Sequence, residues 1–210
     1  MMTQGHHALW LASQPLILAS TSATRLKLLQ DISIPVEPMA AQVDERLIEQ
    51  TLQAQKTHPA QIALALADAK ARDVAARFPN RWIVAADQTL ALGDEQFHKA
   101  ASIERAGEQL KKMRGRTHQL HSAFVCYHGT ERQYGHVETA QLTMRTFSDA
   151  FLAAYLEAAG TRVMQSVGAY QLEGLGIHLF EKIEGDHSTI LGLPLLPLLA
   201  FLRQAGLVEA

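Results

Sequence analysis

The hydrophobic and polar positions in the first part of the chain predict a strand and two helices. Residues 16–19 form a short apolar run, hydroxyl residues follow at 20–22, and Leu26 and Leu29 recur at helical spacing. This pattern predicts strand, loop and helix in that order. An Ala-rich stretch over residues 59–78 predicts a longer helix, because a proline suits its first turn and a Pro-Asn pair follows its end.

The middle of the chain has the patterns of strands. Residues 81–86 are almost continuously apolar, which predicts a strand that is buried on both faces and ends at Asp87. Residues 117–127 and 135–146 predict two more strands, the second with regular alternation. Because turn residues at 128–130 lie between them, we expect an antiparallel hairpin.

The last part predicts helices separated by loops. A serine before residues 149–159 and a glycine after them mark an amphipathic helix. Residues 166–180 are Gly-rich and apolar, and we expect strand and loop there. A loop over residues 185–192 precedes a leucine-rich helix at 194–204.

This order of elements predicts an α/β fold with a mixed central sheet flanked by helices. No repeat, low-complexity tract or linker separates two domains. We therefore expect a single domain over residues 15–210, preceded by a flexible tail over residues 1–14.

Composition narrows the class of protein. The 210 residues are 48% hydrophobic and 19% charged, which is enough to bury a core. The net charge of −2 gives no basic excess for nucleic acid or an anionic membrane, and no apolar run is long enough to cross a bilayer. The single cysteine, Cys126, excludes disulfide scaffolds and fits a reducing cytoplasm. It lies in an apolar stretch, where a small buried hydrophobe is the commoner interpretation.

The hydroxyl residues Ser20, Thr21 and Ser22 lie where the first strand turns into a helix. Free backbone N–H groups and the positive helix end at such a position suit a phosphate, and Arg25 in the first turn adds a guanidinium. An ordinary serine N-cap explains the same pattern equally well.

Lys70 shares one helical row with Leu66 and Val74, so its ammonium is expected within the core-facing stripe. It is either a snorkelling lysine or a partly buried lysine paired with a carboxylate or an anion at a cleft. Asp87, at the expected strand end, is either a ligand-site residue or a solvated turn carboxylate.

Glu45 and Lys99 fall in predicted loops, where solvated charges are the default. Should they meet Lys70, Asp87 and Arg25 in space, carboxylates that hold Mg²⁺ and cations that neutralise phosphate would form a set able to cleave a phosphoanhydride. No histidine spacing typical of a metal site and no P-loop or kinase signature is present.

Several ordered motifs carry a resemblance to a known family. They are LILASTSATRLKLL from Leu16, VDE ending at Glu45, LADAKA around Lys70, VAADQTLAL around Asp87, HKA around Lys99, GRTH at 115–118, GAYQLEGLG at 168–176 and GDHSTILGLP at 185–194. Through these motifs the chain resembles the Maf family over residues 15–207. These proteins, also called septum formation inhibitors, are nucleoside triphosphate pyrophosphatases.

The resemblance implies a Maf/ITPase-like α/β fold with two lobes around a deep cleft. It also implies Mg²⁺ or another divalent cation, release of pyrophosphate from a nucleoside triphosphate, and a homodimer. By position, substrate-binding roles fall to Ser20, Thr21, Ser22, Thr24, Arg25, Gln88 and Glu173. Catalytic roles fall to Glu45, Lys70, Asp87 and Lys99, with Glu45 and Asp87 as metal ligands and Asp87 as general base.

Two positions favour one subgroup. Gln88 and Glu173 match members that resemble 7-methyl-GTP pyrophosphatases, whereas the dTTP/UTP subgroup would have Thr and Gln there. The subgroup that resembles 7-methyl-GTP pyrophosphatases also lacks the first Arg of the common SxSPRR motif, where this chain has Thr24. Around Lys99, HKA replaces the usual GKP. A carboxylate accepts hydrogen bonds from guanine N1–H and the amino group. The alternatives are a dTTP/UTP pyrophosphatase and a regulator of septum formation that binds nucleotide without hydrolysing it.

Overall fold

The computed structural model describes residues 9–210, so the expected tail over residues 1–14 lies mostly outside the described residues. At its described end, Trp10 forms an isolated bridge with Val208, and the Leu11 amide donates to the Leu207 carbonyl. The strands are β1 Leu16–Leu18, β2 Val36–Pro38, β3 Trp82–Leu92, β4 Glu95–Phe97, β5 Thr117–His128, β6 Glu131–Met144 and β7 Phe180–Glu184. The α-helices are α1 Ala23–Asp31, α2 Glu45–Ala54, α3 Pro59–Arg77, α4 Ile103–Met113, α5 Asp149–Ala159, α6 His187–Ile190 and α7 Leu195–Gln204.

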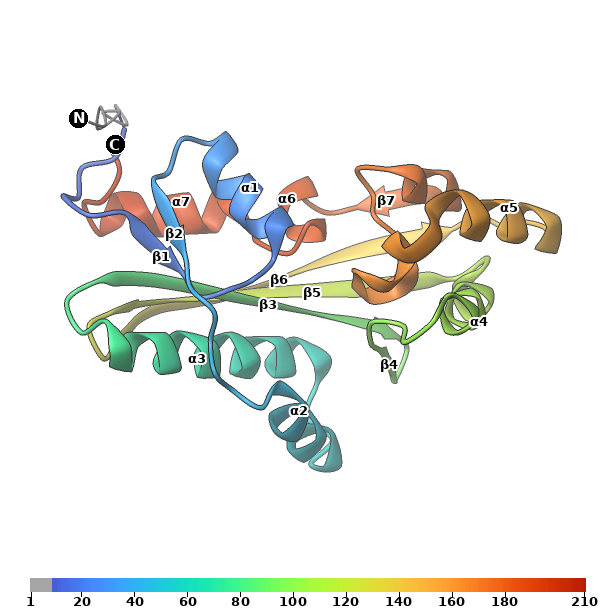
Figure 1. Cartoon of the computed structure of the whole chain (residues 1–210), viewed down its shortest axis with the longest axis horizontal. Coiled ribbons are helices and arrows are strands. Elements are labelled where there is room, and N and C mark those ends of the chain that lie inside the picture. The colour runs from blue at the N-terminus through green and yellow to red at the C-terminus, as the bar shows by residue number, and fades with distance from the viewer. Residues whose placement is uncertain (1–8) are drawn as a thin grey trace.

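The described strands form one mixed sheet in the order β2-β1-β3-β5-β6-β7, with β4 paired to β3. β1 is parallel to β2 and β3, and the other pairs are antiparallel. Figure 1 shows the long strands β3, β5 and β6 running the length of the molecule. The expected α/β fold with a mixed sheet and flanking helices is therefore confirmed.

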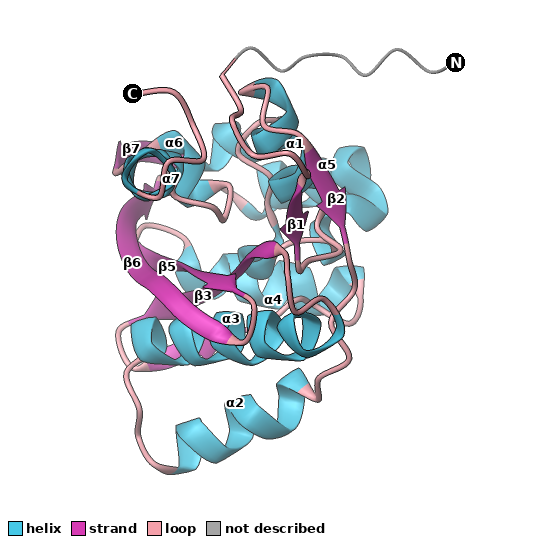
Figure 2. Ribbon diagram, turned by 90° about the vertical axis from the view of Figure 1, so that its left-hand side faces the viewer, coloured by secondary structure: helices cyan, strands magenta, loops and turns pink. Residues whose placement is uncertain are grey.

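Helices cover both faces of one end of this sheet. α3 packs on one face, while α1 and α7 lie on the opposite face (Figures 1 and 2). The alanines at 63, 67 and 71 of α3 are fully buried, and their small side chains allow the helix to lie close to β3 and β5. This close packing fixes the distance between Lys70, on the same helix, and the sheet.

A separate hydrophobic cluster forms the other end of the molecule. It joins the far ends of β3, β5 and β6 to α4 and α5 and to the 3₁₀ turns Gly160–Met164, Val167–Ala169 and Leu175–Leu179. The long strands thus connect two packed regions. No helix within residues 9–210 has the length and apolar content that crossing a membrane requires.

The structure corrects three expectations about the elements. The strand predicted to end at Asp87 continues to Leu92, because β5 pairs with it from Trp82 to Ala91. Residues 166–180 form 3₁₀ turns rather than a strand, and the strand β7 begins only at Phe180. The predicted loop over residues 185–192 contains the short helix α6.

Candidate active site

The N-terminus of α1 presents amides and hydroxyls to a cleft. Ser22 is the N-cap residue, and its Oγ accepts from the Arg25 amide at 3.3 Å. Ser20 Oγ accepts from the Ser22 amide at 3.2 Å. The structure thus shows that Ser22 is an N-cap. The amides of Ala23 and Thr24 begin the helix and have no carbonyl one turn earlier to bind, so they can still receive an anion.

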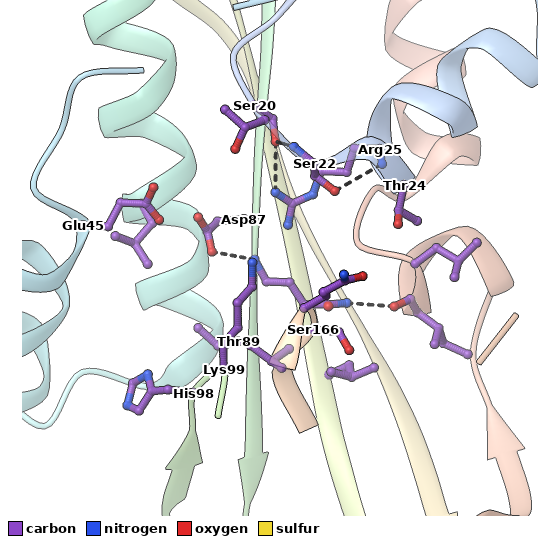
Figure 3. Close-up of a pocket in the computed structure, with 18 of the residues that line it drawn as sticks. Ser20, Ser22, Thr24, Arg25, Glu45, Asp87, Thr89, His98, Lys99 and Ser166 are labelled. Carbon is purple, nitrogen blue, oxygen red and sulfur yellow. Dashed lines mark hydrogen bonds between the residues drawn. The ribbon is translucent and has the colours of Figure 1, made fainter. Parts of the chain in front are cut away.

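Arg25 ties α1 to two distant segments. Its Nε donates to the Gly192 carbonyl at 2.9 Å, and its Nη1 donates to the Ala86 carbonyl at 2.9 Å. Gly192 has φ +99°, and a Cβ there would lie 3.2 Å from Nε, so only glycine fits without strain. Burial lowers the pKa of Arg25, and the carboxylates of Asp87 and Glu45 oppose that effect. The two hydrogen bonds hold the guanidinium at the cleft wall (Figure 3).

Lys70 lies within the buried stripe of α3, only 8% exposed, and forms two ion pairs. Its Nζ contacts Asp87 Oδ2 in a short hydrogen bond and Glu45 Oε2 at 2.8 Å. The structure therefore supports the interpretation of a lysine paired with carboxylates at a cleft. Two carboxylates from different elements converge on one cation, which is the central feature of the site.

The backbone around Asp87 explains why this residue faces a cleft in the middle of a strand. β1 pairs with β3 at Ile83 and Val84, while β4 pairs with the same edge only from Leu90. Between these contacts the edge of β3 has no neighbouring strand, so Asp87, although buried, lines the cavity there, while β5 covers the other edge. Its Oδ1 also accepts from the Gln88 amide at 2.7 Å.

α2 supplies Glu45 and a carboxylate that sequence reasoning missed. Glu45 is the first residue of α2, rather than a loop residue, and Asp44 caps the helix. Glu49, one turn later, also lines the cleft and lies 3.4 Å from His98 Nδ1. Burial raises the pKa of Glu49, while His98 lowers it. Recognition of a helix after VDE would have placed Glu49 beside Glu45, because residues four apart share a helix face.

Gln88 is held by the opposite wall. Its Nε2 donates to Ser122 Oγ at 2.8 Å and to the carbonyls of Thr189 and Ile190. Ser122 Oγ in turn donates to the Thr189 carbonyl at 2.6 Å, so it must accept from Gln88. With its amide nitrogen engaged, Gln88 offers a ligand its carbonyl oxygen, which is a hydrogen-bond acceptor.

These groups line one cavity of about 550 Å³, and its walls come from both packed regions. Figure 3 shows Ser20, Ser22 and Arg25 in one part of it, and His98 and Lys99 in another, with Glu45 and Asp87 between them. Apolar side chains, including Phe97 and Leu120, also line it. The structure brings every site residue expected from the sequence to this cavity: Ser20, Thr21, Ser22, Thr24, Arg25, Glu45, Lys70, Asp87, Gln88, Lys99 and Glu173.

Two histidines and the cysteine lie away from the cavity. His118 and His187 are absent from its walls, and Cys126 is buried in the core, where burial raises the pKa of the thiol. Within residues 9–210 no group of three or more His, Cys, Asp and Glu side chains is arranged to hold a metal ion.

Comparison with known proteins matches nearly the whole chain. Residues 15–205 match the family described as Maf-like protein. A protein of Rhizobium meliloti named 7-methyl-GTP pyrophosphatase is 48% identical, over 93% of this chain and 98% of that protein. A protein of Rhodopseudomonas palustris named nucleoside triphosphate pyrophosphatase is also 48% identical, over 95% and 98% of the two chains. A third, from Bradyrhizobium diazoefficiens and with the same name, is 50% identical over 95% and 98%.

Similarity to solved structures is low. A HAM1 protein from Coxiella burnetii aligns with 62% of this chain and 72% of its own, with 13% identity and a TM-score of 0.40. The sequence matches therefore carry the relationship.

Proposed function

The chain belongs to the Maf family, and from that premise we propose that it is a nucleoside triphosphate pyrophosphatase, a hydrolase acting on an acid anhydride. It would convert a nucleoside triphosphate to the monophosphate and pyrophosphate. The observation that carries the proposal is Lys70 between Asp87 and Glu45, in the same cavity as the N-terminus of α1. Relatives of nearly equal length that bear this name support it.

The polyphosphate would bind between α1 and α3. The first amides of α1, with the hydroxyls of Ser20, Thr21 and Ser22, suit phosphate oxygens. Arg25 and Lys99 would add positive charge on two sides of the chain of phosphates. Arg25 needs no rearrangement to do so, because two backbone carbonyls already hold it.

Glu45 and Asp87 fit a divalent cation. Both offer carboxylate oxygens, and both already point at one positive charge, the Lys70 ammonium. Mg²⁺ is commonly bound by one or two carboxylates together with substrate phosphates, which agrees with the absence of a larger ligand cluster in the described residues. When bound, such a cation would neutralise charge that develops on the phosphates during cleavage.

Asp87 would act as the general base. Its carboxylate would take a proton from a water molecule as the water oxygen forms a bond to phosphorus, and the bridging P–O bond would break to leave the monophosphate and pyrophosphate. Lys70, which contacts Asp87 Oδ2, would hold this carboxylate in place. Lys70 and Lys99 would also stabilise the negative charge of the leaving pyrophosphate.

For the substrate we favour 7-methyl-GTP. Gln88 offers a carbonyl oxygen and Glu173 a carboxylate to the same cavity, and both accept from the N1–H and amino groups of guanine. The negative charge of Glu173 also suits the positive ring of a 7-methylated purine. Relatives from Rhizobium and Mesorhizobium that are named 7-methyl-GTP pyrophosphatases support this choice.

The test is pyrophosphate release by the purified protein with Mg²⁺ from 7-methyl-GTP, GTP, dTTP, UTP, CTP and ITP. We expect the highest kcat/KM for 7-methyl-GTP, and a Glu173→Gln variant should lose most of that preference while keeping turnover. A preference for dTTP or UTP would overturn the substrate assignment. Nucleotide binding without release from any of the six would favour the regulator of septum formation.

A further inference from the structure

The segment that carries Glu173 has a strained backbone. Ala169 has φ +61° and Gly168 φ +85°, so two successive residues are left-handed and one of them is not glycine. A Cβ on Gly168 would lie 2.6 Å from Leu90 and 2.7 Å from the Tyr170 ring, which shows how closely the segment is pressed onto β3. A conformation of this kind persists only where surrounding contacts hold it.

Buried polar contacts hold this segment at the strained turn and at the residue directly after it. Tyr170 Oη and His118 Nε2, on β5, form a hydrogen bond of 2.8 Å. Tyr155 Oη, on α5, donates to the Ala169 carbonyl at 3.2 Å. His118 is fully buried, and burial lowers its pKa to about 4, so the ring stays neutral at ordinary pH.

Ring packing supports the same contact. The rings of His118 and Tyr170 both lie against Phe180, the first residue of β7, with ring centroids 5.9 and 4.8 Å away. The segment is thereby anchored to β5 and β7. The Glu173 side chain is exposed and has little packing of its own. The position of its carboxylate in the cavity therefore depends on the backbone of the segment.

We propose that the hydrogen bond between His118 and Tyr170 positions the Glu173 segment for recognition of the nucleobase. His118 is then a positioning residue that does not contact substrate, since it does not line the cavity, whereas Tyr170 does line the cavity and carries the effect of His118 to the Glu173 segment. The inference rests on the proposed function, because it assumes that a nucleotide base lies against Glu173.

The first test is Tyr170→Phe, which removes one hydroxyl and keeps the ring. We expect KM for 7-methyl-GTP to rise about tenfold with little change in kcat, because contacts to the base act in the ground state and transition state alike. The preference for 7-methyl-GTP over UTP should fall by a similar factor. A purely structural role would instead lower the fraction of active protein, and would leave KM and the preference unchanged.

The matched control is Tyr127→Phe. Tyr127 is also buried on β5, and its hydroxyl donates to Asp68 at 2.9 Å, but neither residue lines the cavity. A His118→Leu change on its own and combined with Tyr170→Phe completes a double-mutant cycle. We expect the double variant to have the same KM as either single variant, and Tyr127→Phe to match the wild type.

Unchanged KM and preference in Tyr170→Phe or in His118→Leu, or the same defect in Tyr127→Phe, would overturn the inference, and His118→Leu decides because Tyr170 lines the cavity and His118 does not. Kd values measured by calorimetry for the same nucleotides distinguish failure of this inference from failure of the proposed function. If the wild type binds nucleotide but releases no pyrophosphate, the proposed function fails, while a tenfold weaker Kd in Tyr170→Phe still supports the positioning role. If the wild type binds no nucleotide, both proposals are wrong.

Discussion

Replacing Lys70 with methionine separates the structural from the catalytic part of the central ion pairs. Met keeps most of the buried stem and removes the charge. The side chains of Lys70 and Asp87 are 10% and 12% exposed, whereas Glu45 is 54% exposed. Removing one partner of a buried pair costs about 3–5 kcal/mol, and an exposed pair contributes at most about 1 kcal/mol. We therefore expect Lys70→Met to lower the free energy of unfolding by about 3 kcal/mol, because Asp87 is left buried and unpaired.

Urea unfolding followed by circular dichroism measures this change, and thermal unfolding should show a Tm lower by roughly 6–12 °C for a chain of this length. Glu45→Gln is the matched control and should cost less than about 1 kcal/mol. Lys70→Met combined with Asp87→Asn should recover most of the stability, because the unpaired charge is gone. Neither variant that lacks Lys70 should release pyrophosphate at a measurable rate.

Two results would refute this reasoning. One is a loss of less than about 1 kcal/mol in Lys70→Met, which would mean that Asp87 is not effectively buried. The other is a double variant as unstable as Lys70→Met, which would mean that the cost comes from the helix packing rather than from the uncompensated carboxylate.

Three other predictions follow from the site and the core. Asp87→Asn should lower pyrophosphate release by about 10²- to 10⁴-fold while cooperative unfolding is retained, and unchanged turnover would exclude Asp87 as the base. Ser22→Ala should cost about 1 kcal/mol in urea unfolding and raise KM, and an unaltered midpoint would show that the cap contributes nothing. Burial lowers the pKa of His118 and His121 to about 4, so the unfolded chain binds more protons between pH 6.5 and pH 4. Stability should therefore be complete above pH 6.5 and fall as the pH drops toward 4, and a urea midpoint equal at pH 7 and pH 5 would contradict this.

Elements with both ends marked in the sequence were predicted closely. α5 occupies residues 149–159 as expected, with Ser148 as its N-cap and Gly160 at φ +55° after it. The hairpin of β5 and β6 is also confirmed, although β6 begins earlier than expected, at Glu131. Caps and turns depend on residues only a few positions apart, so the local sequence is sufficient to specify them.

Elements without such marks were missed or misread. α2 has no fully buried residue, its apolar residues Ile48 and Leu52 are only partly buried, and polar contacts also hold it. The segment at 166–180 has the composition of a strand, yet its left-handed residues and its contacts with β5 and α5 make it a series of 3₁₀ turns. In both places tertiary contacts outweigh local propensity.

The sequence by itself determined which chemical groups this protein carries, the family to which it belongs, and the helices and strands whose ends are capped. The tertiary structure alone decided that Glu45, Lys70 and Asp87 meet, because they come from three elements and only the packing of α3 against the sheet brings them together. It also decided that Asp87 lines the cavity from inside a strand, where β1 has ended and β4 has not begun. Local patterns act over about four residues, whereas an ion pair or a gap in a sheet edge depends on segments far apart in the chain.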